Sequence, residues 1–303
     1  MEADTLHVRA TDNVQPVRRN ERIAPVRTAS HSARATRLPV RPLLMPRRYR
    51  AAFAALATFY RETRTLGTPT PEHRARLDVW EAEIAQVWGG DTRHHPVLSP
   101  LFAQSLPREP LLALIGAQRQ RQETPTYATY DALLAFCAQS TTPVGQLSLA
   151  IFGYTDDERV VLSDAICTAL QLTAFWRDVA RDYARGRIHF PQEDMHLFGV
   201  TEVDLAEAVT NRRADTNIRA LIAFETDRVQ ELFHFGAPLV TLLRGRARLD
   251  CALIISDGRA MLSAIARQGY DPFLTRPHLS RTARAGTILG AVRSISEETL
   301  HLH

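Results

Sequence analysis

The chain has 303 residues, of which 45% are hydrophobic, and a formal net charge of +4. This length and composition are sufficient for one large folded domain. The longest apolar runs, at 53–59 and 111–117, are far shorter than the roughly 20 residues that a membrane-spanning helix needs, so no such helix is expected. The three cysteines lie far apart in apolar sequence, which argues against a disulfide framework and against a zinc site.

The positive charge is concentrated at the N-terminus, where residues 1–50 contain 11 arginines and 4 acidic residues. Residues 1–36 also lack apolar periodicity, and we predict that they form a disordered, Arg-rich extension. The extension has no apolar core of the kind that marks a secretory signal. A transit-like sequence, a tether to anionic lipid and a plain tail remain alternatives for it.

From residue 44 onward the pattern predicts a series of helices separated by proline and glycine. The expected helices cover 46–66, 72–87, 110–121, 127–140, 156–185, 201–209, 218–243 and 247–267, with a short helical start at 191–194. A bend is expected at 141–145, where Gly145 would permit a close approach of the chain. No segment alternates with a period of two, which predicts an all-α fold. Residues 37–290 are expected to form one domain and 291–303 a C-terminal tail.

Two aspartates, Asp178 and Asp182, are four residues apart in a helical stretch. This spacing places both carboxylates on one face of a helix, where they could bind Mg²⁺. The same stretch carries four arginines, which are candidate ligands for phosphate oxygens: Arg177, Arg181, Arg185 and Arg187. A solvated helix face with paired charges is the alternative interpretation.

The stretch 171–200 resembles the second aspartate-rich region of the squalene/phytoene synthase family. Stretches 38–50, 127–137, 140–147 and 268–277 extend the resemblance over residues 36–285, and they are most like the hydroxysqualene synthase branch of bacterial hopanoid biosynthesis. The resemblance implies an isoprenoid-synthase-type helical bundle around a central cavity. It also implies Mg²⁺-dependent ionisation of farnesyl or presqualene diphosphate, giving hydroxysqualene or squalene.

Asp178 and Asp182 are therefore the expected catalytic residues and the expected Mg²⁺ ligands. The resemblance further implies that arginines contact the diphosphate and that aromatic residues line the prenyl pocket. The expected substrate-binding residues are Arg61, Arg64, Arg181, Arg185, Arg187, Tyr49, Phe53, Tyr60 and Phe175. For the aromatic residues, ordinary packing in the core is the alternative.

The first aspartate-rich motif departs from the family pattern. Arg64, Thr65 and Thr68 occupy its three aspartate positions, and only Glu62, a weaker candidate acid, precedes them. Arg121 stands where an acidic residue is usual. Two aspartates would hold fewer Mg²⁺ ions than the family's usual set. We therefore expect a prenyl transferase with reduced or altered catalysis; the alternative is a non-catalytic homologue that binds prenyl diphosphates or partners an intact synthase.

Basic residues outside the N-terminal extension are interleaved with acids, so no nucleic acid is expected as a partner. The expected location is the cytoplasm. Peripheral contact with the membrane is a further expectation, because the implied substrates and products are lipids.

Overall fold

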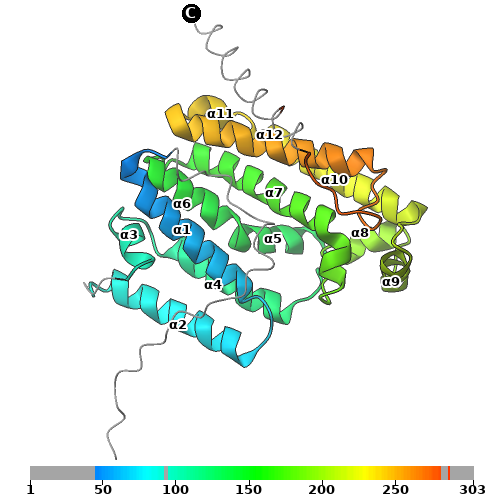
Figure 1. The fold of residues 1–303 in the computed structure, drawn as a ribbon, viewed down its shortest axis with the longest axis horizontal. Helices are drawn as coiled ribbons and strands as arrows, with labels where there is room; N and C mark the ends of the chain where they lie inside the picture. Colours follow the sequence, from blue (N-terminus) through cyan, green and yellow to red (C-terminus); the bar gives the residue numbers. More distant parts are fainter. Residues whose placement is uncertain (1–44, 92–94, 281–285, 287–303) are drawn as a thin grey trace, which may run out of the picture. The chain divides into compact units, whose positions relative to one another are not determined.

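The computed structural model describes residues 45–91, 95–280 and 286, and these residues form helices without any β-strand (Figure 1). The helices are α1 (Arg47–Thr65), α2 (Pro71–Trp88), α3 (Leu98–Phe102), α4 (Glu109–Glu123), α5 (Tyr130–Ser140), α6 (Thr142–Phe152), α7 (Asp157–Tyr183), α8 (Gln192–Leu197), α9 (Glu202–Asn211), α10 (Thr216–Gly236), α11 (Leu239–Leu242) and α12 (Gly245–Arg267). The all-α prediction is confirmed. The predicted extension at 1–36 and tail at 291–303 lie outside the described residues.

Helix α7 runs through the middle of the bundle and packs against α5, α6, α10 and α12 (Figure 1). It begins where the Asp156 side chain accepts a hydrogen bond from the backbone N–H of Arg159, and two acidic residues follow in its first turn. Both features stabilise a helix N-terminus. Its buried face includes Leu172, Phe175 and Trp176. Because α7 is held along its length, its last turns, which carry the two aspartates, have a defined position.

Two hydrophobic clusters form the core. One includes Phe59 and Trp80 and joins α1, α2, α3, α4 and α6. The other includes Phe136, Trp176 and Phe233 and joins α5, α7, α8, α9, α10 and α12. Burial of these apolar side chains is the main favourable contribution to folding. Among the described residues, no helix has the length and apolar character to cross a membrane.

The structure differs from the sequence prediction in having the short helix α3, which was not expected, and at two further places. Residues 141–145, expected to be a bend, instead form the start of helix α6 (Thr142–Phe152), because Pro143 lies in its first turn, where no backbone donor is needed. Gly145 lies inside this helix, and a Cβ there would come within 2.6 Å of Cys167 Sγ. Gly145 therefore serves the packing of α6 on α7. The single helix expected at 218–243 is divided into α10 and α11, with Pro238 between them.

Two connecting segments are held together next to the end of α7. The backbone N–H of Ile188 donates to Pro125 O over 3.0 Å, and that of Gln192 donates to Tyr127 O over 2.9 Å. An isolated parallel bridge joins Tyr127 and Pro191. These bonds fix the segment that follows α7 against the segment between α4 and α5, so residues from α4 and from 185–189 lie in one region.

Glu225 on α10 is fully buried, and neither of its carboxyl oxygens has a hydrogen-bond donor. Arg228 approaches Glu225 only to 3.8 Å, since it donates to Asp194 Oδ2 over 2.7 Å. Burial, and then the charge of Asp194, raise the pKa of Glu225 to about 8. Glu225 therefore keeps its proton at neutral pH.

This raised pKa predicts a pH-dependent stability. Glu225 binds its proton more tightly in the folded state than in the unfolded state, whose pKa is near 4.5. The free energy of unfolding should therefore fall as the pH rises from about 5 to about 8. Glu225→Gln should reduce this fall and stabilise the protein at pH 8.5 by at least about 1.4 kcal/mol, the equivalent of one pKa unit. Urea denaturation of the wild type and of Glu225→Gln at pH 5.5 and 8.5 measures the free energy of unfolding of each protein. Equal pH dependence in the two proteins would contradict the assignment.

Candidate functional site

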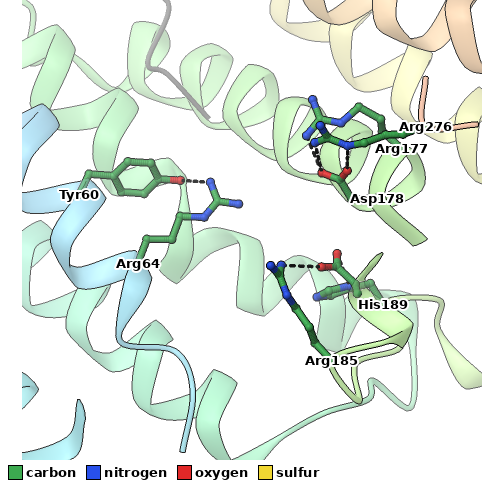
Figure 2. A network of polar contacts seen from close by, with 8 residues as sticks. Tyr60, Arg64, Arg177, Asp178, Arg185, His189 and Arg276 are labelled. Atoms are coloured by element: carbon green, nitrogen blue, oxygen red, sulfur yellow. Dashed lines mark hydrogen bonds and ion pairs between the residues drawn. The ribbon is translucent and has the colours of Figure 1, made fainter. Parts of the chain in front are cut away.

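Asp178 and Asp182 lie one turn apart near the end of α7, as the sequence predicts. Asp178 is held by two arginines. Arg276, from the segment after α12, donates to both of its carboxylate oxygens, and Arg177 donates to Oδ2 over 2.5 Å (Figure 2). The side chain of Asp178 is only 12% exposed. Its charge is therefore balanced within the protein.

The pKa of Asp178 reflects this pairing. Burial alone would raise it, but the hydrogen bonds from Arg276 and Arg177 outweigh burial, and the pKa lies below the ordinary value of an aspartate. Ion pairs and hydrogen bonds to the charged form have this effect on a carboxyl group. Asp178 is thus ionised, and its oxygens already accept charged hydrogen bonds.

Asp182 has a different environment. His189 Nδ1 lies 3.4 Å from its Oδ2, and Arg185 lies 3.9 Å from its Oδ1. Burial, and then repulsion by Asp178, raise the pKa of Asp182. His189 stacks on Phe175 with ring centres 3.6 Å apart, and burial together with nearby arginines lowers its pKa well below the usual value. His189 is therefore neutral at pH 7.

Three arginines from different parts of the chain converge near Asp182. Arg64 on α1 donates to the Tyr60 hydroxyl over 3.3 Å (Figure 2), and Arg187, after α7, donates to Gly67 O over 2.7 Å. Arg121 on α4 lies against the same glycine, because a Cβ at position 67 would be 2.7 Å from Arg121 Cδ. We call Arg64, Arg121 and Arg187 the arginine cluster. Burial, and then the charges of Arg64 and Arg187, lower the pKa of Arg121; burial also lowers the pKa of Arg187, to which the charge of Arg64 contributes.

Two further predicted residues lie in this region. Arg181 is partly buried and lines a hollow of about 150 Å³ beside Asp178, and Arg185 is 48% exposed at the edge of the site. Phe175 and Tyr60, predicted to line a prenyl pocket, are also close to the site. Phe175 lines a hollow next to Asp182 that measures only about 10 Å³, room for at most one water molecule.

The other predicted residues are not brought to the aspartates. Arg61 lies on the exposed side of α1 and donates to Thr58. Tyr49 and Phe53 pack against Phe152 on α6, with ring centres 5.2 and 4.9 Å away. At 1.5 Å of rise per residue, Tyr49 lies roughly 22 Å along α1 from the arginine cluster. Their observed packing is that of core residues.

The positions predicted to correspond to the first aspartate-rich motif extend past the end of α1. Helix α1 ends at Thr65, before Gly67 and Pro69, so Thr68 lies beyond the helix. Three residues can share a face at this spacing only if the helix continues through them. Glu62, the remaining acid on α1, is exposed. The end of α1 therefore presents arginine, and no carboxylate, to the site.

These residues do not fit a magnesium cluster. Mg²⁺ requires oxygen ligands in a near-octahedral arrangement, whereas Asp178 is occupied by two arginines and Asp182 lies beside the arginine cluster. Within the described residues, no group of three or more His, Cys, Asp or Glu side chains is placed to hold a metal ion. Binding of Mg²⁺ to Asp178 and Asp182 stays a prediction that this donor set does not favour.

Three residues of the site were not predicted from the sequence. Arg276 was not predicted as a partner of Asp178, although it lies in the stretch 268–277 that resembles the family. Arg121 was noted only as a departure from the family pattern. His189 follows the second motif closely, and its position between two aromatic rings gave no local signal.

The comparisons with known proteins agree with this fold. The squalene/phytoene synthase family profile matches residues 33–283. The crystal structure of squalene synthase HpnC from Alicyclobacillus acidocaldarius is 40% identical with a TM-score of 0.70, and the match covers 76% of this chain and 88% of that chain. A dehydrosqualene synthase in complex with ligand shares the fold at 23% identity, with a TM-score of 0.76 over 84% of this chain and 89% of that chain.

Among curated proteins, 15-cis-phytoene synthase from Synechocystis sp. is 28% identical over 261 residues, which are 78% of this chain and 74% of that protein. The chain belongs to the squalene/phytoene synthase family, whose members are prenyl transferases. The fold prediction of an isoprenoid-synthase-type helical domain is confirmed. Membership of the family does not by itself show that this chain is catalytically active or that it binds Mg²⁺.

The pairing of Asp178 predicts opposite effects of two similar substitutions. Asp178→Asn should destabilise the protein at pH 7 by about 1–2 kcal/mol, because it leaves Arg177 and Arg276 without their counter-charge. Asp182→Asn should be neutral or stabilising, since ionised Asp182 is disfavoured by burial and by Asp178. Chemical denaturation of the two variants measures this difference. If Asp178→Asn is as stable as the wild type, the arginines do not hold Asp178 as described.

Proposed function

We propose that this chain is a squalene/phytoene synthase homologue that binds a prenyl diphosphate and has lost the metal-assisted release of pyrophosphate. The observation that carries the proposal is that Arg276 and Arg177 both donate hydrogen bonds to Asp178. In addition, the positions of the first aspartate-rich motif contain no acidic residue. Release of a diphosphate requires positive charge that stabilises the leaving group, and metal ions provide it only where carboxylates hold them.

Binding of a diphosphate does not require the metal ions that its release as pyrophosphate requires. A guanidinium group donates two parallel hydrogen bonds to phosphate oxygens without any metal. Arg64 and Arg187 each make a hydrogen bond to an uncharged oxygen, so neither is neutralised by an acid at hydrogen-bond distance. The site therefore supports the retention of a diphosphate better than its departure.

The prenyl part of the ligand rests on the family and on the apolar surroundings. Phe175, Phe136 and Tyr127 form a group of rings next to His189. The similarity to a squalene synthase favours farnesyl or presqualene diphosphate as the ligand. A role beside an intact synthase, in the cytoplasm or at the membrane surface, is part of this proposal.

A second candidate is residual or altered catalysis with fewer Mg²⁺ ions, giving hydroxysqualene or squalene. The one-turn spacing of Asp178 and Asp182 on α7 favours it. Arg276 belongs to the segment after α12, so a movement of that segment alone would remove its contact with Asp178. In this candidate, Asp178 and Asp182 keep the role that the family implies.

One experiment separates the two candidates. The full chain is incubated with farnesyl or presqualene diphosphate and Mg²⁺, and both ligand binding and pyrophosphate release are measured. We expect saturable binding and no release above a sample without protein. Release that disappears in Asp178→Asn would establish catalysis and contradict the proposal. Absence of binding to both lipids would contradict it as well.

A further inference from the structure

Arg121 is a half-buried cation that has no acid at hydrogen-bond distance among the described residues. Its Nε atom is inaccessible to solvent and has no hydrogen-bond partner. Its guanidinium lies 5.4 Å from the centre of the Phe136 ring, and among the described residues it makes no ion pair. Burial, then Arg64 and Arg187, lower the pKa of Arg121 to about 10. An unpaired, partly desolvated charge destabilises a fold unless a ligand compensates it.

The neighbours of Arg121 increase this positive charge. Gly67 is the meeting point, because Arg187 donates to its carbonyl and the side chain of Arg121 occupies the space that a Cβ would fill. Arg64, in the last turn of α1, is three residues before Gly67. Asp182 interacts with Arg121 and Arg187, and burial, followed by the charge of Asp178, raises the pKa of Asp182. Arg121 also interacts with His189, whose pKa burial lowers, and with Tyr127 and Cys137, whose pKa values burial raises, so these three groups are uncharged at neutral pH.

From this geometry we infer that Arg64, Arg121 and Arg187 form a metal-independent site for a diphosphate group, either as free pyrophosphate or at the end of a prenyl chain. The prenyl form of the ligand rests on the proposed function, whereas the diphosphate site does not. Each guanidinium has N–H donors arranged as a fork that matches phosphate oxygens. The unpartnered Nε of Arg121 supplies one of these donors.

A metal-independent site and a metal-dependent site respond in opposite ways to Mg²⁺. Mg²⁺ binds pyrophosphate and reduces its negative charge, so it competes with the arginines. Binding of inorganic pyrophosphate should therefore be tighter in EDTA than in Mg²⁺ at equal ionic strength, and it should weaken as salt is added. Calorimetric titration of the full chain measures both effects. Binding that requires Mg²⁺ would overturn the inference.

A purely structural role for Arg121, with its side chain packed on Phe136, predicts a different outcome for Arg121→Met. If Arg121 is structural, the variant loses stability. If Arg121 belongs to an anion site, the unliganded variant gains stability, with a melting temperature about 2 °C or more above the wild type, and its affinity for pyrophosphate falls about tenfold or more. A variant that is less stable and still binds pyrophosphate normally would contradict the inference.

The matched control is Arg119→Met on the same helix. Arg119 is exposed and pairs with Asp78 and Glu81 over 2.7 and 2.6 Å, so its loss removes the same charge outside the site. Its affinity for pyrophosphate should equal that of the wild type. Arg64→Gln serves as a second site variant, because Arg64 is half-buried near the surface and its loss leaves the core intact. It should also weaken binding about tenfold, and unchanged binding would count against the arginine cluster.

A titration with farnesyl diphosphate in EDTA separates the two sources of the ligand. Tighter binding of the lipid than of pyrophosphate supports both the site and the proposed function. Equal binding supports the site for free pyrophosphate and contradicts prenyl recognition. Binding of the lipid only when Mg²⁺ is present overturns the metal-independent site and leaves the proposed function standing.

Discussion

The ion pair between Asp178 and its two arginines determines which chemistry is open to the end of α7. A carboxylate in a helix can bind a metal ion only if its oxygens are available, and those of Asp178 accept hydrogen bonds from Arg276 and Arg177. The same pairing explains why Asp178 and Asp182, one turn apart, have opposite pKa shifts. Two aspartates at the spacing of a metal site thus differ in the direction of their pKa shifts and in their partners.

The other side of the site carries positive charge. At the end of α1, helix termination at Thr65 removes the frame that an acidic cluster would need, and Arg64 introduces positive charge. Arg121 adds a second cation from α4, and Arg187 adds a third from the segment that backbone hydrogen bonds hold next to α4. A site of this charge attracts a phosphate-bearing ligand and repels a divalent cation. The chain thus belongs to the squalene/phytoene synthase family by its fold, and this side of its site is formed by arginines.

Much of this structure could be predicted from the sequence because it depends on local patterns. The spacing of apolar residues predicted most of the helices, and the spacing of Asp178 and Asp182 predicted that they share a face. The helix at 142–152 was missed, because Pro143 and Gly145 usually interrupt helices. Here Pro143 needs no donor in the first turn, and Gly145 is required by contact with Cys167, which only the tertiary structure reveals.

The partners of the site residues could not be predicted for the same reason. Arg276 and Asp178 are separated by 98 positions, and no local pattern indicates their pairing. Helical periodicity showed that Tyr49 and Phe53 face inward on α1, but it does not specify which part of the interior they face. They pack against Phe152, in the core.

The most direct test of the arginine cluster as an anion site is a crystal structure of the full chain with pyrophosphate in the absence of divalent cations. The account predicts electron density for the anion between Arg64, Arg121 and Arg187, with Arg276 still paired to Asp178. Density for pyrophosphate that appears only when Mg²⁺ is added, with metal ions bound to Asp178 and Asp182, would contradict it.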